Sequence, residues 1–100
     1  MKTVIETPTF SKLADKIWTE DERLDFISFI SKNAKSGEVI PNAEGARKVR
    51  WGVKGSGKRG GTRIIYFNLS EQGIIELIYI YKKVKQANMT ANDIKKVDRT

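Results

Sequence analysis

The N-terminal third of the chain has the hydrophobic spacing of two helices. In the first of them, apolar residues recur at i, i+3, i+4, i+7 and i+8, which is typical of an amphipathic helix. These residues are Phe10, Leu13, Ala14, Ile17 and Trp18. The preceding segment, Thr3–Glu6, is predicted to form a short strand that ends before Pro8.

A second helix is predicted to begin after Thr19. The sequence from Thr19 to Glu22 fits a capping box, in which each of these two side chains accepts a hydrogen bond from the backbone of the other residue. The helix is expected to run to about Asn33 and to present one apolar face to the core. The residues expected on that face are Leu24, Ile27 and Ile30, with Phe26 or Phe29 at its margin.

The second half of the chain changes to a period of two, which is typical of strands. Residues 46–53 alternate loosely, and two β-branched and aromatic segments follow, Thr62–Leu69 and Ile74–Tyr81. Because turn residues separate the three segments, they are predicted to form an antiparallel meander. Thr90 and Asp93 are predicted to open a short C-terminal helix.

Helices followed by a run of strands predict the α+β class. We expect a single domain of residues 1–100, in which a short N-terminal strand and a two-helix hairpin precede a meander that packs on the helices. One hundred residues support one modest hydrophobic core. A content of 39% hydrophobic and 31% charged residues is ordinary for a folded globular chain.

The chain contains no cysteine and no histidine. Disulfides and thiolate metal sites are therefore excluded, and the commonest metal ligand and general base is missing. We expect neither a metal nor a cofactor, so any catalysis would use Lys, Arg, Tyr or carboxylate side chains. The apolar runs are far shorter than a membrane span, and the N-terminus lacks the apolar block of a secretion signal. A cytoplasmic protein without membrane contact is expected.

The net charge of +7 is concentrated in the middle of the sequence. Residues 45–89 carry ten Lys and Arg against two Glu, a balance of +8. Within them, the segment Arg47–Arg63 holds seven cations and five glycines and has no acidic residue. Because such a cluster of like charges costs stability, we expect a polyanion to neutralise it, and an RNA or DNA backbone is the natural candidate.

Two phosphate-binding patterns occur in this segment without the context that they require. Gly55–Gly60 matches G-x-G-x-x-G, and Gly52–Lys58 matches the first part of a P-loop. Both precede a predicted strand instead of opening a helix, and Arg59 stands where a P-loop has its Mg²⁺-binding Ser or Thr. Dinucleotide binding and NTPase activity are therefore rejected.

Alternation along the predicted strands brings several cations to one face of the sheet. Lys48 and Arg50 share a parity, and Arg63 begins the next strand, so the three side chains can lie side by side across a hairpin. Lys82 and Lys83 follow on the last strand and are expected to join them from its edge.

The same rule assigns the aromatic residues of these strands. Trp51 opposes Lys48 and Arg50 in parity and is expected in the core. Tyr79 and Tyr81 share a parity and are expected on one face, where they either pack in the sheet core or stack on a base.

The cationic segment and its flanking strands resemble the RelE/HigB-type toxins of bacterial toxin–antitoxin modules. The resemblance rests on Lys48–Arg50, Lys54–Gly61, Arg63–Tyr66 and Ile78–Lys83, and it is closest to the HigB branch with a KGxGKRGG hairpin loop. It implies a RelE-like α+β fold and a ribosome-dependent endoribonuclease that cuts mRNA in the 30S A site and so inhibits translation. It also implies a cognate antitoxin as partner, of the helix-turn-helix, HigA-like kind.

The resemblance further implies a set of site residues. The catalytic cations of the family fall on Lys48, Arg50, Arg63 and Lys83. Further RNA contacts are expected from nearby cations and one tyrosine. These are Arg47, Lys54, Lys58, Arg59, Lys82 and Tyr81.

These residues are expected to support RNA cleavage without a metal. The 2′-hydroxyl attacks the neighbouring phosphate, which gives a 2′,3′-cyclic phosphate and a 5′-hydroxyl, while Arg50 and Arg63 stabilise the developing charge. Lys48, packed among the other cations, is the expected base, and Lys83 or an arginine is expected to assist the leaving oxygen. Some family members have a functional tyrosine near the C-terminus, where this chain has Asn88-Met89. Tyr81 is the substitute that the sequence offers.

Two other functions are open at this stage. A non-catalytic module could dock the same basic face on RNA or DNA, with salt-sensitive binding and no cut product. A ParE-like toxin on the same fold would inhibit DNA gyrase through protein contacts, which require no phosphate-binding centre. The cluster of Lys48, Arg50 and Arg63 favours the nuclease.

Overall fold

The computed structural model of the protein describes residues 2–52, 61–83 and 89–99. A strand and two helices come first, and a run of strands and a short helix follow, which confirms the predicted α+β class. The elements are β1 (Thr3–Glu6), α1 (Pro8–Ile17), α2 (Glu20–Lys32), β2 (Glu38–Val39), β3 (Arg47–Trp51), β4 (Thr62–Leu69), the 3-10 turn η2 (Ser70–Gln72), β5 (Ile74–Lys82) and α3 (Ala91–Lys95).

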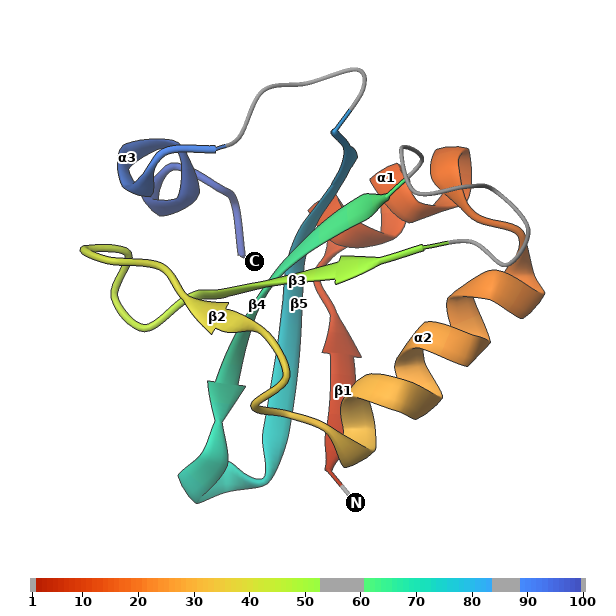
Figure 1. Ribbon diagram of the computed structural model, residues 1–100, viewed down its shortest axis with the longest axis horizontal. Helices are drawn as coiled ribbons and strands as arrows, with labels where there is room; N and C mark the ends of the chain where they lie inside the picture. The colour runs from red at the N-terminus through yellow and green to blue at the C-terminus, as the bar shows by residue number, and fades with distance from the viewer. Residues whose placement is uncertain (1, 53–60, 84–88, 100) are drawn as a thin grey trace.

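The strands form one mixed, five-stranded sheet with the order β1-β5-β4-β3-β2 (Figure 1). β3, β4 and β5 make the predicted antiparallel meander. β1 lies parallel to β5, with Thr3 opposite Ile74, and β2 pairs antiparallel with β3 at the far edge. The two outer pairings extend the sheet beyond the prediction, because β1 and β5 are far apart in sequence and β2 has only two residues.

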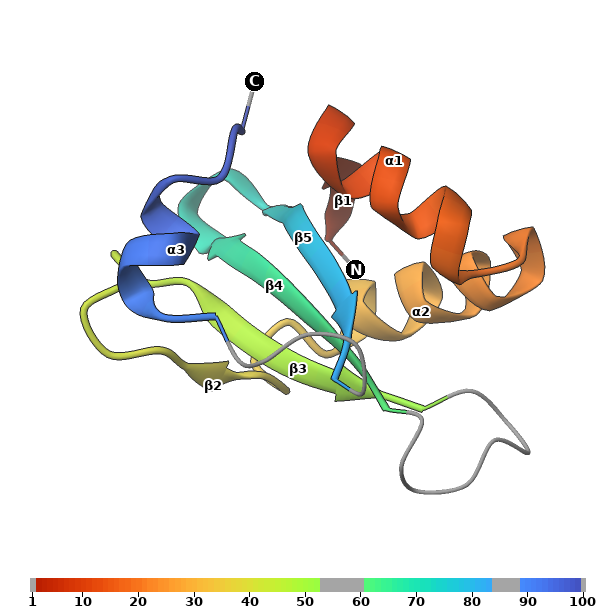
Figure 2. The ribbon, with the colours of Figure 1, turned by 90° about the horizontal axis from the view of Figure 1, so that it is seen from above.

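The helix pair covers one face of the sheet, and α3 lies on the other face (Figure 2). α2 begins with the predicted capping box of Thr19 and Glu22, and it ends at Lys32, with Asn33 as its C-cap. The prediction of a helix pair is therefore confirmed. None of the helices in the described ranges has the length and apolar character that a bilayer crossing requires.

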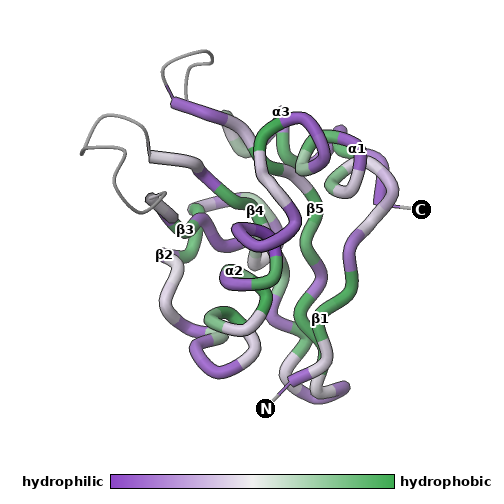
Figure 3. The backbone as a smooth tube through the Cα atoms, turned by 90° about the vertical axis from the view of Figure 1, so that its right-hand side faces the viewer, coloured by the Kyte–Doolittle hydropathy of each residue, from purple (hydrophilic) through white to green (hydrophobic). Residues whose placement is uncertain are grey.

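The core between the helix pair and the sheet is aromatic and aliphatic. Its side chains come from α1, α2 and the three central strands, and Figure 3 shows hydrophobic residues along β4 and β5. The largest fully buried members are Phe10, Phe26, Ile30, Ile64, Tyr66, Ile75, Leu77 and Ile80. Since full burial of a Leu, Ile or Phe side chain stabilises a fold by about 1.5–3 kcal/mol, this layer fixes the sheet on which the site is built.

The buried face of α2 differs from the predicted one. Phe26 and Ile30 are fully buried, whereas Leu24 is 55% exposed and Ile27 is only partly buried. The prediction for Leu24 is therefore wrong, and the prediction for Ile30 is confirmed. Of the two rings named for the margin, Phe29 lies there partly buried, and Phe26 lies in the core. The helix is turned so that the Phe26 ring meets the Trp51 ring edge-on, with centroids 5.4 Å apart. Ring packing of this kind favours burial of the larger side chain.

The opposite face of the sheet is only partly covered. α3, which opens with the predicted Thr90 and Asp93 cap, packs there in a second core cluster with Ile65, Phe67 and Tyr81. The cationic ends of β3, β4 and β5 extend beyond this cluster.

Candidate functional site

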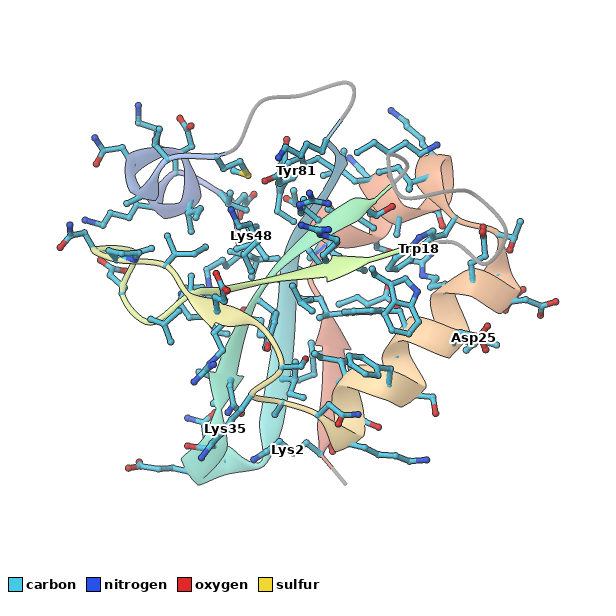
Figure 4. The ribbon with its side chains drawn as sticks, in the orientation of Figure 1. Lys2, Trp18, Asp25, Lys35, Lys48 and Tyr81 are labelled. Carbon is cyan, nitrogen blue, oxygen red and sulfur yellow. The ribbon has the colours of Figure 1, made fainter. Side chains whose placement is uncertain are left out.

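Two neighbouring strands, β3 and β4, bring basic side chains to the face opposite the helix pair. Arg50 on β3 stands directly across from Arg63 on β4, whose partner on β5 is Tyr81. Directly opposed residues of an antiparallel ladder point to the same face, and Lys48 shares the face of Arg50 because it lies two residues away. Arg50, Arg63 and Tyr81 therefore form one row across the sheet. Lys48 and Tyr81 lie in the same part of the molecule, away from Trp18 (Figure 4).

A groove of about 500 Å³ opens beside this row. Its lining includes four cations, which come from β3, β4 and the turn after β5. They are Lys48, Arg50, Arg63 and Lys83. The backbone N–H of Lys83 donates to the Gly61 carbonyl at 3.4 Å, which holds the turn beside the start of β4. The structure thus brings together the four residues that the family resemblance names as a catalytic set, and we call this site the cationic groove.

Arg63 is the most deeply buried cation of the cationic groove. Only 8% of the residue is exposed, and its Nη1 atom is buried without a hydrogen-bond partner among the described residues. A buried charged donor without a partner costs free energy, and a bound anion that accepts from it would remove that cost. Arg63 is therefore the residue on which a phosphate oxygen fits best.

Gly61 leaves the space in which the two arginines converge. A Cβ atom at this position would lie 2.6 Å from Arg63 Nη1 and 3.4 Å from Arg50 Cγ. A contact of 2.6 Å is too short for carbon and nitrogen, so any other residue at position 61 would displace the Arg63 guanidinium.

One wall of the groove follows the loop between α2 and β2, which Tyr66 fixes from the core side. The Tyr66 hydroxyl donates to the Ala34 carbonyl at 2.8 Å and accepts from the Gly37 backbone N–H at 3.0 Å. Arg47 Nη1 donates to the Gly37 carbonyl at 2.7 Å. Glu38 follows directly and lines the cationic groove, so these hydrogen bonds set its position.

Tyr81 completes the row on the β5 side, but its ring is packed inside the protein. The residue is 3% exposed and belongs to the core cluster beside α3. Burial raises the pKa of its hydroxyl, and the nearby Met89 backbone and the positive charge of Arg63 partly offset the rise. The ring therefore offers no free face for the base stacking expected from the sequence.

The other RNA-contact candidates do not line the groove. Arg47 lies on the opposite face of β3 from Lys48, where it bonds to the loop carbonyl, and Lys82 lies on the opposite face of β5 from Tyr81. Three further candidates fall outside the described residues, namely Lys54, Lys58 and Arg59. We therefore leave Arg47 and Lys82 out of the candidate site.

A second groove, of about 700 Å³, lies between α2 and the end of β3. Trp51 and Phe29 form part of its lining, with ring centroids 4.8 Å apart, and Trp51 packs against the core as predicted. Glu22 and Asp25 also line this groove. Because their carboxylates repel phosphate, the cationic groove is the better candidate for a polyanion.

The chemistry available in the cationic groove is that of fixed positive charge. Guanidinium and ammonium groups bind phosphate oxygens and stabilise negative charge that develops on them. In the ranges that the structure describes, no three acidic side chains gather in a way that could hold a metal ion.

The sheet order and the helix pair define the class of this protein as a RelE-like α+β fold. No known protein-family model matches the sequence. The chain is similar in structure to the E. coli toxin RelE, solved in the free state as a double arginine-to-alanine mutant. The TM-score is 0.60 at 13% sequence identity, over 85% of this chain and 86% of the RelE chain. At this level of identity the match establishes the fold.

Two residues of the site were not predicted from the sequence, Glu38 and Gly61. Glu38 belongs to β2, a strand of two residues, and it stands opposite Lys48 of β3. A strand this short shows no alternation of apolar and polar residues from which it could be predicted. Gly61 is one of five glycines in the cationic segment, and only its distance from Arg63 distinguishes it from the others.

Proposed function

We propose that this protein is the toxin of a toxin–antitoxin module and acts as a ribosome-dependent mRNA endoribonuclease. The observation that carries the proposal is the convergence of Lys48, Arg50, Arg63 and Lys83 in one groove of a RelE-like fold. The buried Nη1 of Arg63, which has no partner among the residues that the structure describes, supports it, because a phosphodiester would supply an acceptor.

The proposed reaction is cleavage by the RNA's own 2′-hydroxyl without a metal. This hydroxyl oxygen bonds to phosphorus, the bond to the 5′-oxygen breaks, and a 2′,3′-cyclic phosphate and a 5′-hydroxyl result. Arg63 and Arg50 stabilise the charge on the phosphate, and one preorganised donor of this kind contributes about 10²–10³ in rate. Lys83, at the groove margin, assists the leaving oxygen.

The ribosome supplies the geometry that the reaction needs. A cationic groove binds phosphates but does not by itself align a 2′-oxygen with the phosphorus and the leaving oxygen. Holding the mRNA in the 30S A site in that alignment would lower the barrier by preorganisation. This explains why a small chain with few catalytic groups acts on mRNA during translation.

A cognate antitoxin, HigA-like and with a helix-turn-helix domain, is the proposed inhibitor. The balance of +8 in residues 45–89 suits an acidic antitoxin segment.

The two alternatives account for less of the site. A non-catalytic RNA- or DNA-binding module would be served by exposed cations, and it gives no reason for a buried arginine donor. A ParE-like gyrase inhibitor on the same fold would act through protein contacts and needs no phosphate centre.

Expression of the Arg63→Ala variant in bacteria tests the proposal. We expect the wild-type protein to arrest growth and to produce new in-frame mRNA 5′ ends, and we expect both effects to disappear in the variant. Lys12→Ala removes an equal charge from the exposed side of α1 and serves as control. Unaltered arrest by Arg63→Ala contradicts the assignment. Arrest without new 5′ ends favours gyrase inhibition if DNA breaks accumulate, and nucleic-acid binding if they do not.

A further inference from the structure

The proposed reaction needs a group that accepts the proton of the 2′-hydroxyl more readily than the ammonium group of Lys48. Lysine and arginine side chains are protonated at neutral pH, whereas carboxylates are ionised and can accept a proton. The chain has no histidine or cysteine. A base for this reaction therefore has to be a carboxylate or a side chain that is normally protonated.

Glu38 is the one carboxylate that lines the cationic groove among the described residues. It begins β2, where it stands directly across from Lys48 on β3. Opposed residues of an antiparallel pair share a face, so the Glu38 side chain lies on the same face as Lys48 and Arg50. The register of the sheet therefore places a carboxylate within the cationic set.

Glu38 is also free to react. Its side chain is exposed, and within the described residues it forms no ion pair, whereas Glu6 and Glu76 pair with Arg23 and Arg99. The charged groups that share its groove are Lys48, Arg50, Arg63 and Lys83. Four positive charges hold the substrate phosphate, and the single negative charge stands beside them.

We propose that Glu38 is the general base of the cleavage reaction, an inference that rests on the proposed endoribonuclease function. The Glu38 carboxylate takes the proton from the 2′-hydroxyl as the 2′-oxygen bonds to phosphorus. The bond from phosphorus to the 5′-oxygen breaks, and that oxygen takes a proton from the Lys83 ammonium group. Transfer of a proton from the Glu38 carboxyl group through water to Lys83 restores both residues.

If Glu38 had no catalytic role, removal of its carboxylate would affect cleavage in the opposite direction from removal of a general base. Next to a bound phosphodiester it would only repel, so its removal would tighten RNA binding and leave cleavage equal or faster. A general base contributes about 10²–10⁴ in rate, so its removal slows cleavage even when binding improves. The sign of the effect on cleavage separates the two roles.

The test is single-turnover cleavage of mRNA on programmed ribosomes by the wild type, Glu38→Gln and Glu38→Asp. We expect Glu38→Gln to cleave at least about 10²-fold more slowly while it binds the mRNA–ribosome complex at least as tightly. The wild-type rate should fall as the pH is lowered, Glu38→Gln should lose this dependence, and Glu38→Asp should keep it with part of the rate. Glu71→Gln, which removes an exposed carboxylate from η2, is the charge-matched control.

A Glu38→Gln variant that cleaves at the wild-type rate or faster overturns the inference. In that case cleavage by the wild type and its loss in Arg63→Ala leave the proposed nuclease intact. A wild-type protein that cuts no mRNA on ribosomes overturns both proposals.

Discussion

Two buried polar side chains on opposite faces of the sheet, Tyr66 and Arg63, differ in how their polar atoms are satisfied. On the face under the helix pair, the Tyr66 hydroxyl is fully buried and has both a donor and an acceptor within the chain. On the other face, Arg63 is nearly as buried, yet its Nη1 has no partner in the described part of the chain. The chain itself satisfies the Tyr66 hydroxyl, whereas the Arg63 donor is left available to a ligand.

The difference shows how a small protein separates stability from chemistry. Alternation along a strand sends neighbouring residues to opposite faces, so β3 packs Val49 into the core, from which it also reaches the groove lining, and turns Lys48 and Arg50 to the other face. Substitutions on one face should change the free energy of unfolding, and substitutions on the other should change activity.

The largest expected effect is on the helix-covered face. Phe26→Ala removes a fully buried ring and should lower the free energy of unfolding by about 3–5 kcal/mol. Leu24→Ala, two residues away on the same helix, should cost less than about 0.5 kcal/mol because Leu24 is largely exposed. Urea unfolding of the two variants measures the difference. A larger loss for Leu24→Ala than for Phe26→Ala would show that α2 buries the face predicted from the sequence.

The next largest effects are expected for substitutions of two arginines of β3, one of which should impair cleavage and the other stability. Arg50→Ala should slow mRNA cleavage about 10²-fold and leave the unfolding free energy unchanged, because Arg50 is exposed in the groove. Arg47→Ala should lower the unfolding free energy by about 1–2 kcal/mol, since it loses the hydrogen bond to Gly37, and its folded form should still cleave. Cleavage assays and urea unfolding on both variants check this crossed pattern. If the same variant were the more impaired one in both assays, the assignment of Arg50 to cleavage and of Arg47 to stability would be refuted.

The smallest effect concerns the space around Arg63. Gly61→Ala places a methyl group against Arg63 Nη1 and should slow cleavage about tenfold, or ~1.4 kcal/mol in the barrier, with little change in stability. Gly37→Ala is the contrasting variant, because its Cβ would lie 2.9 Å from the Lys48 backbone carbonyl, so it should mainly destabilise the fold. The two assays described above distinguish these outcomes. Undiminished cleavage by Gly61→Ala would mean that Arg63 acts equally well from a shifted position.

Features set by near neighbours in the chain could be predicted from the sequence. The bounds of β4 and the capping boxes of α2 and α3 match the predictions, because each depends on residues within a few positions. Parity alone also assigned Lys48 and Arg50 to one face, and a hairpin then brings in Arg63.

Features that depend on distant contacts could not be predicted. The burial of Phe26 in place of Leu24 is set by the Trp51 ring on another strand. The position of Glu38 in the groove depends on the register between β2 and β3. Periodicity describes one element at a time, so it cannot supply the rotation of a helix against a sheet or the offset between two strands.

The pairing of β1 with β5 has a consequence for how the protein is made. Thr7 donates to the Leu77 carbonyl from its hydroxyl at 3.0 Å and from its backbone N–H at 3.1 Å, across a sequence separation of 70 residues. A nascent chain therefore exposes the apolar side of its helices until the last strand has been translated, and contacts of such long range slow folding. The row of Arg50, Arg63 and Tyr81 is likewise complete only after this strand has been made, because Tyr81 lies on β5.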